Sequence, residues 1–123
     1  MQIGWCTLQT QFSQHEGVGD DECSYAFDGY RRVKWNQGQQ AYGQRWVTGD
    51  VIGTMIDLDK GTIRYWRNGQ PLGVAFSNVK SGPNMAYFPA ISMQKQERCI
   101  FNFGLRPFCA TDLPFEACAI NEP

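Results

Sequence analysis

The sequence has little of what catalysis, metal binding or membrane insertion would need. It contains one histidine, His15, and five cysteines with no CxxC pair, so it offers no zinc ligand set at the usual spacing. No Asn-x-Ser/Thr site occurs, and no apolar run reaches about 18 residues or follows a basic leader. We therefore expect a reduced, cytoplasmic (intracellular) protein that has no metal site and does not associate with a membrane.

An excess of positive or of negative charge is also absent. Lys and Arg number 11 and Asp and Glu number 12, which gives a formal net charge of −1. This balance argues against a protein that holds nucleic acid or an anionic membrane by charge alone. Residues 30–35 interleave basic and aromatic side chains, a pattern that could suit single-stranded nucleic acid, but a half-exposed strand is the simpler interpretation. We expect no nucleic-acid partner.

Catalytic and phosphate-binding motifs are missing as well. A Ser-His-Asp or Cys-His site could use only His15, and no GxSxG elbow is present. Residues 57–61 (DLDKG) fail the EF-hand register, which needs glycine at the sixth position and glutamate at the twelfth. Gly17-Val18-Gly19 lacks the third glycine of a phosphate-binding loop. We expect no catalytic residues, no cofactor and no enzymatic activity.

Glycine and aromatic residues are abundant instead. Glycine accounts for 13 of the 123 residues, above its usual share of about 7%, and aromatic residues make up 14%. A chain of this length suits one domain with a hydrophobic core of its own. Short aromatic and β-branched runs between glycine-rich turns favour an all-β fold.

The order of these runs predicts two packed antiparallel sheets, a β-sandwich. In residues 49–76 the turns Asp59-Lys60-Gly61 and Asn68-Gly69 predict a three-stranded meander. The first strand of the meander is predicted at residues 51–58, with Ile52, Ile56 and Leu58 on one face. Ile63 and Tyr65 begin the alternation of the return strand, and the third strand runs through Leu72 and Phe76. Further strands are expected at residues 1–7, 24–28, 30–35, 86–92 and 99–104, with polar loops at 8–22 and 36–44 and an irregular tail from 105. The aromatic side chains assigned to the core or its support are Trp5, Phe27, Trp66, Phe88, Phe101 and Phe103, and Cys99 is predicted to point inward beside the last two.

Six motifs resemble those of the SPRY domain, the core of the B30.2 family. They follow the family's order: QIGW at 2–5, SYAFDG at 24–29, GDVIGTMIDLDKGTIRYWRNG at 49–69, LGVAF at 72–76, YFPAIS at 87–92 and FNFG at 101–104. One such motif would be weak evidence, whereas six in order are specific. Residues 15–36 are most similar to SPRY domains that stand beside RING fingers in E3 ubiquitin ligases, and ryanodine-receptor calcium channels carry a similar run.

The resemblance implies a bent antiparallel β-sandwich that has no enzymatic activity and recognises a protein or short peptide through loops at one end. It implies a SPRY domain at residues 1–108, followed by a tail at 109–123 that packs on or trails the sandwich. SPRY domains usually have strands before the QIGW-like strand, so the domain is expected to lack these N-terminal strands and to leave a sheet edge or groove open. No RING sequence is present, so the chain is expected to belong to a larger multidomain protein.

The predicted specificity loops are residues 10–22, 36–45 and 94–98. SPRY domains with a peptide pocket use aromatic and aliphatic residues in the first and last of these loops, whereas this chain has polar ones, so a more polar ligand is expected. The predicted partner-binding residues are His15, Glu16, Lys95 and Arg98, with Trp35 and Tyr42 as aromatic anchors. The alternative is ordinary strand packing for Trp35 and a solvated turn for Lys95 and Arg98.

Two functional hypotheses follow. The first is a module that selects a partner protein, for instance a ubiquitination substrate, on behalf of a larger protein. The alternative is an intramolecular scaffold that docks permanently against neighbouring domains of a large protein such as a calcium-release channel. An exposed apolar patch would favour the scaffold, and a concave pocket among the three loops would favour ligand binding.

Overall fold

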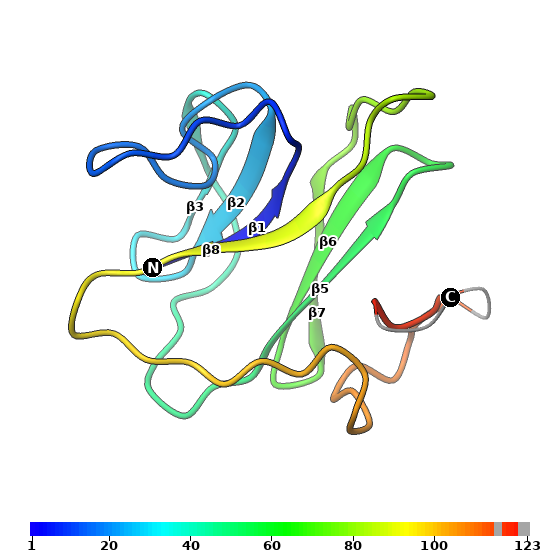
Figure 1. Ribbon diagram of the computed structural model, residues 1–123. Coiled ribbons are helices and arrows are strands. Elements are labelled where there is room, and N and C mark those ends of the chain that lie inside the picture. The colour runs from blue at the N-terminus through cyan, green and yellow to red at the C-terminus, as the bar shows by residue number, and fades with distance from the viewer. Residues whose placement is uncertain (115–116, 121–123) are drawn as a thin grey trace.

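Eight short strands make up the regular structure of the computed structural model, which describes residues 1–114 and 117–120. Five form one antiparallel sheet in the order β4-β3-β2-β1-β8, and β5-β6-β7 form a second (Figure 1). No helix occurs among the described residues, and the predicted all-β sandwich is confirmed. The strands are β1 (Gln2–Cys6), β2 (Ser24–Asp28), β3 (Val33–Trp35), β4 (Gln39–Ala41), β5 (Ile52–Asp57), β6 (Thr62–Arg67), β7 (Gln70–Phe76) and β8 (Phe88–Ser92).

The alternation of side chains along β1 and β2 decides which residues enter the core. The register pairs Ile3 with Phe27 and Trp5 with Tyr25, so these side chains share the face that meets the second sheet. Phe27 is fully buried, and its ring lies 5.2 Å from that of Tyr65 on β6. The buried cluster between the sheets consists of Trp5, Tyr25, Phe27, Ile63, Tyr65, Ala75 and Val79.

Three side-chain hydrogen bonds connect strands of the two sheets, one of them from Lys34 Nζ to the Ala75 carbonyl and two from buried aromatic residues. The Trp5 indole N–H donates to Thr54 Oγ1 at 3.0 Å, and the Tyr65 hydroxyl donates to the Ile3 carbonyl at 2.9 Å. Both aromatic donors belong to buried residues, and a buried donor without a partner would destabilise the fold. The sandwich is therefore a rigid support for the loops that leave it.

The meander of β5, β6 and β7 forms as its turn residues predict. Asn68 and Gly69 have φ angles of 50° and 82°, the left-handed pair that a type I′ turn requires. Leu58, predicted to share one face of the first strand with Ile52 and Ile56, lies outside β5 and is 39% exposed, so that prediction is wrong. Because β5 ends at Asp57, Leu58 belongs to the turn and no longer follows the alternation of the strand.

The prediction of a last strand at residues 99–104 is also wrong. These residues form no strand, Cys99 is exposed, and Phe101 and Phe103 are 54% and 44% exposed. The two rings stack on each other, with centroids 5.5 Å apart and planes inclined by 17°. They do not enter the core between the sheets.

The backbone beyond residue 99 has other hydrogen-bond partners than a neighbouring strand. The Asn102 side-chain oxygen accepts from the N–H groups of Gly104 and Arg106, and its amide donates to the Arg106 carbonyl at 3.0 Å. This local turn satisfies groups that a sheet ladder would otherwise use. An alternating pattern specifies a strand only where a partner strand is available.

Two smaller differences concern the edges of the five-stranded sheet. Phe88, assigned to the core or its support, is 43% exposed because its register partner is Cys6, which points away from the second sheet. Strand β4 (Gln39–Ala41) lies inside the predicted loop 36–44. Its three exposed residues bury nothing, so the sequence carries no alternation that could have revealed it.

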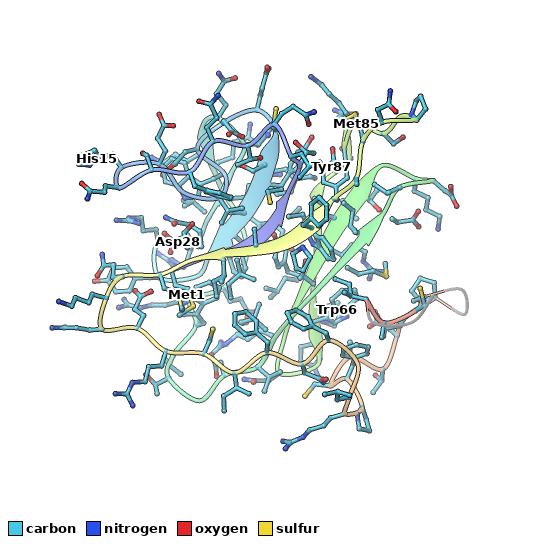
Figure 2. All side chains as sticks on the ribbon, viewed as in Figure 1. Met1, His15, Asp28, Trp66, Met85 and Tyr87 are labelled. Atoms are coloured by element: carbon cyan, nitrogen blue, oxygen red, sulfur yellow. The ribbon has the colours of Figure 1, made fainter. Side chains whose placement is uncertain are left out.

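Trp66 supports the fold from outside the core. It is only 2% exposed although it lies on the face of β6 that points away from the first sheet. Its indole N–H donates to Asp112 Oδ1 at 2.7 Å, and the Arg64 guanidinium lies 4.9 Å from its ring centre. Asp112 is therefore anchored against β6 through Trp66, which Figure 2 labels on the right-hand side of the molecule.

Candidate functional site

The β1–β2 loop, residues 7–23, folds back across the outer face of the five-stranded sheet. The Val18 N–H donates to Ser92 Oγ of β8 at 2.9 Å, and the Gln37 N–H donates to the Gly19 carbonyl at 2.9 Å. Val18 is 1% exposed. The Gly17-Val18-Gly19 motif is thus a structural element that lays the loop across four strands, from β8 at one edge to β3.

The sheet beneath this segment is lined by small residues. Gly4, Ala26 and Ala90 are direct register partners in β1, β2 and β8, and they point to the outer face. A side chain on Gly19 would lie 2.6 Å from Trp35 Cβ and 3.0 Å from Ala26 Cβ. Only a backbone without side chains at this position can approach the sheet so closely.

Two of the three acidic residues at 20–22, Asp20 and Asp21, brace the loop. Asp20 Oδ2 accepts from the Gly17 N–H at 2.7 Å, and Asp21 Oδ1 accepts from the Cys23 N–H and the Ser24 hydroxyl. Asp21 Oδ2 also accepts from the Gln11 N–H at 3.1 Å. These bonds leave the loop with a fixed base.

The tip of the loop is exposed and locally ordered. Ser13 Oγ accepts from the N–H groups of His15 and Glu16 at 3.1 and 3.0 Å, and the Ser13 N–H donates to the Glu16 carbonyl. His15, Glu16 and the neighbouring Phe12 are all exposed. Figure 2 shows His15 at the outermost part of the molecule on that side. The loop therefore presents two of the predicted contact residues on a supported turn.

The two other charged residues of the predicted site lie on residues 93–98, the segment that leaves β8. Lys95 and Arg98 are exposed, and Glu97 closes a turn by accepting from the Gln94 N–H at 3.3 Å. The Met1 amino group lies 3.3 Å from Glu97 Oε1. Because the β1–β2 loop is bonded to Ser92, this segment departs from the edge of the sheet that the loop also touches, and both extend on the same side in Figure 1.

The two predicted aromatic anchors have packing roles. The Trp35 side chain lies against Gly19, and its buried Nε1 has no hydrogen-bond partner among the described residues. The Tyr42 ring meets Phe27 edge-on at 5.2 Å, and its hydroxyl donates to the Gly73 carbonyl at 2.7 Å. Burial raises the pKa of Tyr42 to about 12. Trp35 thus supports the β1–β2 loop, and Tyr42 supports the junction of the sheets.

Two hollows in the described part of the chain lie away from residues 36–45 and 94–98. One, of about 390 Å³, is lined by residues 104–108, by Leu113 and by residues 117–119. The other, of about 300 Å³, is lined by both ends of the β1–β2 loop, by Tyr25 and by residues from 80 to 87. We call the second one the end cleft. Sequence reasoning missed it, although Tyr87 and Met85 beside a Ser-Gly-Pro loop were a signal of apolar side chains near a turn.

The described residues contain no group of three or more His, Cys, Asp or Glu side chains that could hold a metal ion. Burial, followed by the nearby Asp21, raises the pKa of the Cys6 thiol, which disfavours a reactive thiolate there. Among the residues that the structure describes, no helix is long and apolar enough to cross a membrane.

Comparison with known proteins agrees with this architecture. The family model of the SPRY domain matches residues 1–106. The chain belongs to the SPRY domain family. It is similar to the E3 ubiquitin-protein ligase RKP of Arabidopsis thaliana, with 53% identity over 108 residues. That match covers 87% of this chain but 8% of the relative, so the chain spans less than a tenth of that protein's length.

Proposed function

We propose that this SPRY domain is a non-catalytic interaction module that binds a protein or short peptide through the tip of the β1–β2 loop and residues 93–98. The observation that carries the proposal is the bracing of the loop, in which Val18 is buried while His15 and Glu16 are exposed. A loop already held in one conformation loses little freedom on binding. Exposed side chains on such a rigid support are typical of recognition loops.

The chemistry of the proposed surface is polar and of mixed charge. Glu16 supplies a carboxylate, while Lys95 and Arg98 supply cations, and His15 offers a ring nitrogen. Such a surface suits a ligand segment with hydrogen-bonding groups and charges of both signs. Trp35 contributes to this site by supporting the β1–β2 loop, whereas Tyr42 supports the junction of the sheets.

The similarity to RKP supports a role within a ubiquitin ligase. In this proposal the domain is one part of a larger protein and recruits a substrate, while ubiquitin transfer is carried out by other parts. Nothing in the domain itself needs to react, which agrees with a site made of loop side chains rather than of activated nucleophiles.

A second candidate function, docking against another domain of the same larger protein, is favoured by an exposed apolar segment. Ile100 and Leu105 are 98% and 90% exposed, and Phe101, Phe103 and Phe108 are about half exposed. Contiguous apolar side chains of this kind are typical of protein contact surfaces. In this alternative, residues 100–108 would be covered permanently, and the loop tip would meet no free ligand.

The test compares proteins captured from lysate by the immobilised domain and by a variant that combines His15→Ala with Lys95→Glu. We expect specific partners to bind the variant at least about tenfold more weakly, a loss typical of removing central contacts. Both substitutions lie at exposed positions, so unfolding midpoints should be unchanged.

Lys60→Glu is the matched control, because it makes the same charge change on the exposed β5–β6 turn. Retention by the control and loss by the loop variant would support the proposal. Equal capture by all three proteins would contradict it. If Ile100→Ser with Leu105→Ser then abolished capture, the docking function would be the better account.

A further inference from the structure

The end cleft lies apart from the loop tip and is built from three chain segments. Gln9 and Glu22 come from the two ends of the β1–β2 loop, Tyr25 comes from β2, and the remaining wall comes from residues 80–87. Figure 2 places Met85 and Tyr87 at the upper right and His15 at the far left. The cleft and the proposed loop surface are therefore separate regions of the domain.

The floor of the cleft is apolar and aromatic. The Tyr25 and Tyr87 rings lie 6.2 Å apart and are tilted by 47°, and Met85 lines the same cleft. Met85 adds a flexible, polarisable thioether, which packs well against aromatic rings and adapts to different apolar groups. At about 300 Å³ the cleft can hold one large apolar side chain.

The walls of the cleft are held in place by hydrogen bonds. The Tyr87 hydroxyl donates to the Lys80 carbonyl at 2.6 Å, which closes residues 80–87 into a loop. On the other wall the Cys23 carbonyl accepts from the Thr7 N–H and the Thr10 hydroxyl. Burial, together with the neighbouring Tyr25, raises the pKa of Tyr87 to about 12.

Three polar side chains at the cleft have no hydrogen-bond or ion-pair partner within the described part of the domain. Glu22, Lys80 and Asn84 all line the cleft, and none of their side-chain groups makes a hydrogen bond or ion pair with a described residue. Glu22 and Lys80 come from opposite walls and carry opposite charges. An occupant is therefore favoured if it is apolar in the middle and carries a cation toward Glu22 and an anion toward Lys80.

We propose that the end cleft is a second peptide-binding site, which takes a short extended segment with one large apolar side chain between a basic and an acidic residue. The apolar side chain would fill the space over Tyr25, Tyr87 and Met85. The flanking charges would pair with Glu22 and Lys80. Asn84 would hydrogen-bond to the backbone of the segment.

The experiment uses the whole chain labelled with ¹³C at the methionine methyl groups. Its four methionines include Met85 in the cleft, Met55 on β5 as an internal control, and Met1 and Met93 as reporters of the separate loop surface. The probes are the blocked pentapeptides Gly-Lys-Leu-Glu-Gly and Gly-Glu-Leu-Lys-Gly, each also made with serine in place of leucine. We expect the Met85 methyl signal to shift and saturate with one leucine peptide, and the serine version to bind about tenfold more weakly or worse.

Exchanging the charges of Glu22 and Lys80 distinguishes a peptide-binding site from a hollow that binds nothing specifically. The double variant Glu22→Lys with Lys80→Glu changes two exposed positions, and it should reverse the preference between the two charge orders. The loop variant His15→Ala with Lys95→Glu should bind the pentapeptides as the wild type does, even if the loop proposal fails. If none of the peptides shifts the Met85 signal at millimolar concentration, the proposal is wrong. It is also wrong if the leucine and serine peptides bind equally.

Discussion

At position 19 both the backbone conformation and the surrounding side chains require glycine. Its φ of +96° lies in the left-handed region that favours glycine, and a β-carbon would meet Trp35 Cβ at 2.6 Å. We expect Gly19→Ala to lower the free energy of unfolding by about 1–3 kcal/mol, because it combines a strained backbone with a clash. Gly38→Ala is the control, since a β-carbon there meets nothing within 4 Å. Urea unfolding of both variants checks this, and equal losses would contradict it.

Asp50 carries a carboxylate whose pKa is lowered in the folded state. Hydrogen bonds from the Asn68 amide, the Val47 N–H and the Arg67 guanidinium lower its pKa from 3.8 to about 2. A lowered pKa in the folded state means that the contribution to stability is complete above the ordinary value and is lost as the pH falls through about 2.

We expect Asp50→Asn to remove this part of the acid sensitivity. The wild type should lose stability between neutral pH and about pH 2, and the variant, which carries no titrating group there, should lose less over the same range. Urea midpoints measured at the two pH values give the comparison. Identical pH dependence in both proteins would show that the carboxylate does not act through these bonds.

Among the elements, residues 99–104 differ most from what their alternating pattern predicts. If Phe101 pointed into the core, Phe101→Ala would lower the free energy of unfolding by roughly 3–5 kcal/mol, as truncation of a buried phenylalanine does. Because Phe101 is 54% exposed, we expect Phe101→Ala to lose less than about 1 kcal/mol. Phe27→Ala, at a position with no exposed surface, should lose about 3–5 kcal/mol. Denaturant midpoints of the two variants check this, and a large loss of stability in Phe101→Ala would favour the predicted inward strand instead.

The meander and residues 99–104 show why elements differ in how far sequence predicts them. In the meander, Asn68-Gly69 and Asp59-Lys60-Gly61 bring each strand next to its own neighbour, so all the needed information is local. Residues 99–104 follow β8 after only residues 93–98, yet they pair with no strand, and their alternating pattern alone does not show whether a sheet edge is available to them. β4 has a partner but buries none of its side chains, and the hydrophobic pattern therefore cannot reveal it.

At the scale of the whole molecule, the two sheets are joined by few but buried polar contacts. Thr54→Val keeps the shape of the side chain on β5 but removes the acceptor of the Trp5 indole N–H, whose residue is 6% exposed. We expect a loss of about 1–3 kcal/mol, because the donor is left unsatisfied.

Thr62→Val is the control for that substitution. Thr62 lies in β6, and its hydroxyl makes no hydrogen bond with any described residue. We expect a change within about 0.5 kcal/mol. Thermal or urea unfolding of the two variants provides the measurement, and equal effects would mean that the bond from Trp5 does not contribute to holding the sheets together.

The sequence by itself determined the sandwich class, the meander and the SPRY family, because these depend on side-chain period, on turn residues and on motifs in a fixed order. It also determined that His15, Glu16, Lys95 and Arg98 belong to loops, since their surroundings are polar. Only the tertiary structure decided that Gly17-Val18-Gly19 crosses the sheet to Ser92, that Trp66 is covered by Asp112, and that the end cleft exists. These features join residues that are far apart in the chain, and such contacts form only when packing brings their segments together.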